Sequence, residues 1–71
     1  MSRQMMAIDL MNMGSATNFG TKLFELIAKA DFVNRETLRI AYPEQVAFWE
    51  EWQARTNGPT WLAALAQGEE E

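Results

Sequence analysis

The 71-residue chain contains no histidine and no cysteine. General-base and nucleophilic catalysis use these two residue types more often than most others, and structural zinc sites are built largely from them. Without cysteine the chain also has no disulfide to stabilise a small core. The missing residue types therefore disfavour an enzyme, and we expect no catalytic residues, no metal and no cofactor.

Long apolar runs are also missing. No segment approaches the roughly 20 apolar residues that a membrane-spanning helix needs. The first residues lack the basic segment and the continuous apolar stretch of a signal peptide. We therefore expect a cytoplasmic protein that makes no contact with a membrane.

Positive charge is scarce as well, since the formal net charge is −4. Residues 1–43 hold five Lys and Arg against four Asp and Glu, whereas residues 44–71 hold one against six. This distribution disfavours nucleic acid as a partner of the whole domain. It favours either antiparallel pairing of two copies or a partner with a basic surface for the second half.

Aromatic residues, by contrast, are concentrated in the second half of the chain. Aromatic side chains are enriched where proteins bind one another, so we take as the candidate partner-binding surface Tyr42, Phe48, Trp49, Trp52 and Trp61. Within this group Phe48 and Trp52 are predicted to face a partner, whereas Trp49 is predicted to face the core together with Val46. The alternative is that all five fill the core or a dimer interface.

Apolar periodicity predicts a core helix over residues 18–30, because Phe19, Leu23 and Ile27 recur at helical spacing. Either Thr17 or Asn18 is expected to cap its start.

Three shorter helices are expected to follow. Asn34 is predicted to cap the second helix, which ends near Tyr42 because Pro43 disfavours helical geometry in the residue before it. Pro43 is expected to open the third helix at its first-turn position, and this helix ends at residues 57–59. The last helix is expected over residues 59–67.

The start of the chain fits two patterns equally well. Met6, Leu10 and Met13 indicate a weakly amphipathic helix, whereas Met6, Ile8 and Leu10 indicate a short strand. We therefore describe residues 1–15 as a Met-rich arm, residues 16–67 as a single helical domain and residues 68–71 as an acidic tail. A domain of this size hides only about 60% of its unfolded surface, so we expect an all-α, three- to four-helix homodimer.

Residues 27–39 resemble the helix-turn-helix pattern of DNA-binding proteins. Val33 precedes a capping polar residue, Asn34, between two short helices. The sequence departs from that family at Phe32, which stands where a glycine usually adopts a left-handed conformation.

The helix-turn-helix resemblance implies that Arg35, Thr37 and Arg39 contact the DNA groove. On a net-acidic protein, however, two arginines one turn apart more often belong to a solvated face or to intersubunit salt bridges.

A longer string of residues resembles small helical proteins encoded by tailed phages and prophages. It covers about half of the chain and comprises residues 26–31, 34–35, 38, 42–44, 46, 49 and 52. This resemblance brings no catalytic residues and implies a compact accessory protein. Phage quorum-sensing anti-activators are similar in size and type: they are dimeric helical proteins that bind a LuxR-type transcription activator and a type IV pilus assembly ATPase.

We therefore expect a non-catalytic modulator that masks a functional surface of a host protein, such as a LuxR-type activator or a pilus assembly ATPase. The alternative is a small dimeric helix-turn-helix regulator that binds DNA. A third possibility is a virion or assembly component.

Overall fold

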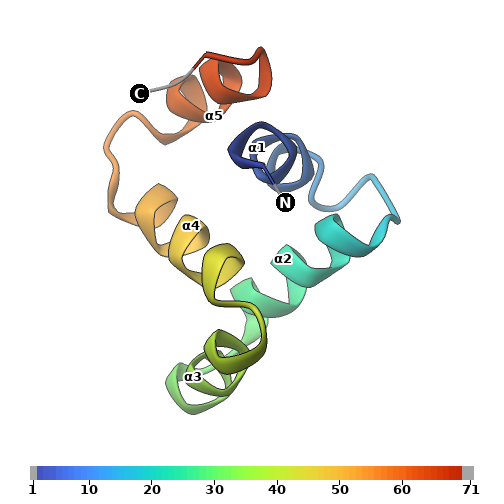
Figure 1. The fold of residues 1–71 in the computed structure, drawn as a ribbon, viewed down its shortest axis with the longest axis vertical. Helices are drawn as coiled ribbons and strands as arrows, with labels where there is room; N and C mark the ends of the chain where they lie inside the picture. The colour runs from blue at the N-terminus through green and yellow to red at the C-terminus, as the bar shows by residue number, and fades with distance from the viewer. Residues whose placement is uncertain (1, 70–71) are drawn as a thin grey trace.

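The computed structural model describes residues 2–69 of the chain. These residues contain five helices joined by short connections (Figure 1). They are α1 (Arg3–Met11), α2 (Phe19–Lys29), α3 (Phe32–Ala41), α4 (Pro43–Ala54) and α5 (Gly58–Ala66). The described residues contain no strand. The expected all-α class is confirmed. The chain has five helices instead of three or four because its first segment is also helical.

Within residues 1–15, which were expected to form an arm, Arg3–Met11 form helix α1. The Ser2 hydroxyl caps α1 by accepting a hydrogen bond of 3.1 Å from the amide of Met5. Met6, Ala7 and Leu10 are buried, and α1 packs mainly on α5. Of the two alternatives for this segment, the helix is the one observed. Its buried residues lie on one side of the helix and pack against α5.

The core is centred on the ring of Phe48. This ring stacks on the indole of Trp61 at a centroid distance of 5.2 Å and meets Phe24 at 6.2 Å in a tilted arrangement. The guanidinium carbon of Arg3 lies 5.3 Å from the centroid of the same ring. Phe48 therefore connects α1, α2, α4 and α5, whereas α3 lies outside this cluster.

A buried polar network joins α1 to α2. Asn18, one of the two predicted caps, precedes α2 and donates a 2.8 Å hydrogen bond to the carboxylate of Asp9. Its side-chain oxygen accepts a hydrogen bond from the hydroxyl of Thr21, which is fully buried. The two helices are thus held by polar side chains whose partners lie within the network.

The connection between α2 and α3 differs from the predicted helix-turn-helix turn. Asp31 caps α3 by accepting a 2.8 Å hydrogen bond from the amide of Asn34, so Asn34 lies inside the helix and is not its cap. Ala30 and Asp31 are both extended, and no residue other than glycine has a positive φ among the described residues. Phe32 simply begins the helix, because the short Asp31 side chain satisfies the free amide.

The boundaries of the last two helices follow the proline and glycine positions. Pro43 begins α4 as predicted, and Tyr42 alone separates α3 from α4. Gly58 begins α5 and is buried against Trp52. Glu69 is exposed, and the rest of the predicted acidic tail, Glu70 and Glu71, lies outside the described residues. No helix within residues 2–69 has the length and apolar character required to span a membrane.

Substitution of Gly58 by alanine is expected to destabilise the fold by about 1–3 kcal/mol. An added Cβ would lie 2.8 Å from Nε1 of Trp52, so the indole must move. Helix propensity alone predicts the opposite sign, because alanine is favoured over glycine by up to about 1 kcal/mol. Urea unfolding followed by tryptophan fluorescence measures the change. Thr60→Ala, an exposed change in the same helix, is the control, and an equal or higher stability for Gly58→Ala contradicts the tight Trp52 contact.

Candidate protein-binding surface

Two of the five predicted partner-binding aromatics lie in the core. Phe48 is only 1% exposed, and Trp61, stacked on it, is also buried. The structure therefore places Phe48 in the core, although it was expected to face a partner. Its ring packs on Phe24 of α2 and Trp61 of α5, within the buried cluster that also contains Val46.

The other three aromatics are half-buried, and each has different neighbours. Trp49 is covered by the guanidinium of Arg35, whose carbon lies 4.5 Å from the ring centroid. Trp52 lines an open hollow together with Leu10, Met11, Pro59 and Leu62, which we call the Trp52 pocket. Tyr42 precedes α4, and its ring approaches Phe19 of α2 at a centroid distance of 6.0 Å.

Exposed apolar side chains gather elsewhere, on α2 and α3. Of the seven large apolar residues that are exposed, five belong to these two helices: Phe19, Leu26, Phe32, Val33 and Ile40. The sequence-based reasoning missed this group because it followed the aromatic residues. The signal was the spacing of Val33 and Ile40, which are seven residues, or nearly two turns, apart and so share one helix face.

Helix α3 turns its apolar side to solvent. Phe32, Val33 and Ile40 are 72%, 70% and 85% exposed, and no residue of α3 is buried. Its charged side, with Arg35 and Arg39, faces α4 instead. Figure 1 shows α3 at the end of the molecule far from α5. We call Phe32, Val33 and Ile40 the outer face of α3.

All four arginines of the chain are engaged within the domain. Arg39 contacts the carboxylates of Glu36 and Glu50 at 2.8 and 2.6 Å. Arg35 covers Trp49 and donates a hydrogen bond to the carbonyl of Ala30. The remaining two, Arg3 and Arg55, both pair with Glu51.

The candidate DNA-contacting residues do not form one surface. Thr37 lies on a different side of α3 from Arg35 and Arg39, and its hydroxyl donates to the carbonyl of Val33. The two guanidinium groups are turned towards α4, so they present no row of free donors to a phosphate backbone.

The carboxylates around α4 are stabilised in their charged form. Hydrogen bonds from Arg39 lower the pKa of both Glu50 and Glu36. Hydrogen bonds from Arg3, and secondarily from Arg55, lower the pKa of Glu51. The negative charges of Glu50 and Glu51 are therefore balanced by arginines of the same chain. These residues are poorly placed to attract a basic partner.

A mainly apolar groove lies between α2 and α3. Its larger part, about 310 Å³, is lined by Leu26, Lys29, Ala30, Asn34, Thr37 and Leu38. A second part of about 200 Å³ adds Phe19, Lys22, Leu23 and Tyr42, and Leu26 lines both. We call the two parts together the α2–α3 groove. Its walls are mainly apolar, and its charged residues are two lysines.

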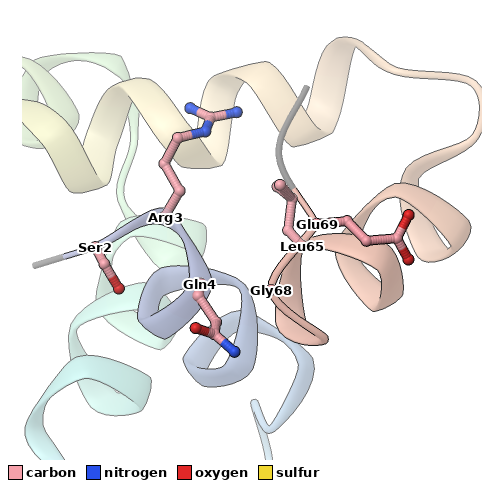
Figure 2. Close-up of a pocket in the computed structure, with 6 residues that line it drawn as sticks. All are labelled: Ser2, Arg3, Gln4, Leu65, Gly68 and Glu69. Atoms are coloured by element: carbon pink, nitrogen blue, oxygen red, sulfur yellow. The ribbon is translucent and has the colours of Figure 1, made fainter.

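A third hollow lies where the start of α1 meets the end of α5 (Figure 2). It measures about 180 Å³. Arg3 reaches from it towards Glu51 of α4, whereas Gln4 donates to the carbonyl of Ala66. The side chains of Arg3, Gln4 and Glu69 point in different directions in Figure 2. No set of polar groups therefore converges on one point, as a catalytic site requires.

Comparison of the chain with protein-family models, curated proteins and solved structures finds no match. Within residues 2–69, no cluster of three or more acidic side chains is arranged to hold a metal ion.

Acidification is expected to destabilise the fold through the carboxylates of α3 and α4. Because the pKa of Glu36, Glu50 and Glu51 is lowered below 4.5 in the folded state, the unfolded chain binds more protons as the pH falls through about 4.5. Their contribution is therefore complete at neutral pH and is lost as the pH falls through the lowered folded values. Thermal unfolding between about pH 7 and about pH 3 measures this loss.

Glu50→Gln is expected to lower the Tm at neutral pH and to reduce the further loss in acid. Glu69→Gln is the control, because Glu69 is exposed and its side chain points away from that of Arg3 in Figure 2. A Glu50→Gln profile identical to that of the unchanged protein contradicts a stabilising Arg39–Glu50 contact.

Proposed function

We propose that this protein is a non-catalytic, protein-binding inhibitor that holds an amphipathic segment of its partner in the α2–α3 groove. The single observation behind the proposal is the gathering of exposed apolar side chains on α2 and α3, of which Phe19 and Leu26 line the groove itself. Apolar surface of this extent on a small protein marks an interaction site.

The shape and chemistry of the groove favour a helix as its ligand. Leu26 lies in the middle of the groove, and Phe19 and Leu38 line its two parts. Such a row of apolar side chains accepts residues that recur along one face of an amphipathic helix. Lys22 and Lys29 border the row on α2. Lys22 is paired with Glu25 of the same helix, whereas Lys29 favours a helix that carries an acidic residue beside its apolar ones.

Electrostatics therefore change the partner expected from the sequence. The acidic second half was expected to guide the chain to a basic surface. Arg39, Arg3 and Arg55 neutralise Glu50 and Glu51, however. Lys22 is likewise paired with Glu25, at 3.2 Å, so Lys29 is the groove lysine that favours an acidic segment instead.

The proposed mechanism is steric masking in the cytoplasm of the host. A partner helix bound in the groove is withdrawn from its own function, and no chemical step by the inhibitor is needed. The resemblance to phage anti-activators provides the class of target that we propose, a host transcription activator or an assembly ATPase. We also propose that the inhibitor acts as a homodimer.

Leu26→Asp is expected to weaken partner binding at least about tenfold, because it places a charge at the centre of an apolar groove. The partner is first captured from the native host and identified by mass spectrometry, and its affinity for the purified variants is then measured by calorimetry. Circular dichroism checks that the fold is retained.

Met11→Asp provides the matched control. Met11 is 51% exposed and Leu26 is 53% exposed, but Met11 lies in the Trp52 pocket on the other side of the molecule. Binding that survives Leu26→Asp and is lost in Met11→Asp or Trp52→Ala assigns the partner to the Trp52 pocket and refutes the groove. A steep loss of binding with salt, abolished by neutralising Arg35 and Arg39, indicates the DNA-binding alternative instead.

A further inference from the structure

We infer that the outer face of α3 is the contact between two copies of this chain, which pair their α3 helices in antiparallel fashion about a two-fold axis. The inference is independent of the groove ligand, because the outer face and the groove lie on different sides of α3. It assigns an occupant to the most exposed apolar residues of the molecule.

The first argument is the self-complementary spacing along α3. Val33 and Ile40 lie on one helix face, about 10 Å apart along the axis. The point midway between them falls between Glu36 and Thr37. A two-fold axis at this point places Val33 of one copy opposite Ile40 of the other. It also places Ile40 of the first copy opposite Val33 of the second. Such an isologous contact buries both residues of each copy with a single surface.

Charge is the second argument for a second copy. The outer face contains no lysine or arginine, and the one acidic side chain beside it, Glu36, is already paired with Arg39. Residues 19–42 hold four basic and three acidic residues, so most of the excess negative charge lies elsewhere. Two copies that meet through α3 therefore keep their acidic parts away from the contact. A partner selected by charge would find almost none on this face.

The third argument is the arrangement of the Glu36–Arg39 pair. An antiparallel pairing centred between residues 36 and 37 brings Glu36 of one copy close to Glu36 of the other. Within each copy the Glu36 carboxylate already accepts a 2.8 Å hydrogen bond from Arg39, so the proximity of the two carboxylates is compensated.

The available area predicts a weak dimer. A fully exposed side chain of this size offers on the order of 150 Å², so the outer face contributes roughly 350 Å² per copy at the observed exposures. The total for two copies is then roughly 700 Å², below the roughly 1,200 Å² at which stable specific interfaces begin. We therefore expect a dimer that forms in the micromolar range and dissociates on dilution.

Sedimentation of the full chain between about 1 and several hundred µM tests the inference. The unchanged protein is expected to shift from monomer to dimer over this range. Val33→Asp and Ile40→Asp each place two charges in the contact, and each is expected to weaken the dimer at least about a hundredfold. Because both residues are mostly exposed in the monomer, circular dichroism is expected to remain unchanged.

Leu26→Asp is the control and is expected to dimerise normally, since Leu26 lies in the groove. A chain that stays monomeric throughout, or a Val33→Asp variant that dimerises like the unchanged protein, overturns the inference. Dimerisation lost in Leu26→Asp and kept in Ile40→Asp also overturns it, because the contact is then the groove.

Cysteine crosslinking tests the antiparallel register directly, because the chain has no cysteine of its own. A disulfide requires Cβ atoms about 4 Å apart. A mixture of Val33→Cys and Ile40→Cys proteins is expected to form the mixed disulfide under mild oxidation, whereas each variant alone is expected to crosslink poorly. Preferential crosslinking of Val33→Cys with itself overturns the antiparallel arrangement.

Discussion

The ring of Phe48 is the contact on which most of this structure depends. It touches the aromatic side chains of α2 and α5, and the guanidinium of Arg3 from α1 lies over it. Four of the five helices therefore meet at one residue of α4. A chain of this length buries little surface in total, so its large rings are used in the centre. This use of Phe48 and Trp61 removes both rings from the surface.

Helix α3 stands outside that centre, and its orientation follows from its short connections and its arginines. Two extended residues join it to α2, and Tyr42 alone separates it from α4. Arg35 lies on Trp49 and Arg39 on Glu50, so the charged side of α3 is turned to α4. A half-turn of the helix would bury Val33 and Ile40 but would expose both arginines. In the observed orientation Val33 and Ile40 stay exposed. The roughly 1.5–3 kcal/mol of stability that burial of each large apolar side chain can contribute is therefore not gained. In the proposed dimer, a second copy would recover this contribution.

Local signals in the sequence were sufficient for α2, α4 and α5. The spacing of Leu23 and Ile27, the position of Pro43 and the one-turn spacing of Trp61 and Leu65 each have one local explanation. The start of the chain was undecided because Met6 and Leu10 fit both a helical and a strand period. Only packing against α5 distinguishes the two. The cap of α3 was misplaced by three residues, since Asp31 and Asn34 are both good caps and only the hydrogen bond shows which is used.

The candidate site was harder to predict than the fold, for a physical reason. Aromatic content indicates how much area can be buried, but it does not indicate whether a core or a partner buries it. Within α4, Phe48 is sealed whereas Trp52, four residues later on the same helix, is only half-buried. The outer face of α3 had a clear signal in the spacing of Val33 and Ile40. Whether these two residues face the core or the solvent depends on the rotation of α3 about its axis. The contacts of α3 with Trp49 and Glu50 of α4 determine that rotation.

The proposed dimer through α3 would have a consequence for the proposed masking. The two-fold axis is perpendicular to the paired helices. Rotation about this axis does not change the direction along it, so both grooves lie on the same side of the pair. Both grooves then open towards one side of the dimer, close to the shared contact. A target that is itself dimeric, or that offers two acidic helices, is held at two points, and the second binding event becomes intramolecular. Two individually weak contacts, each limited by the small size of the chain, can in this way combine into effective inhibition.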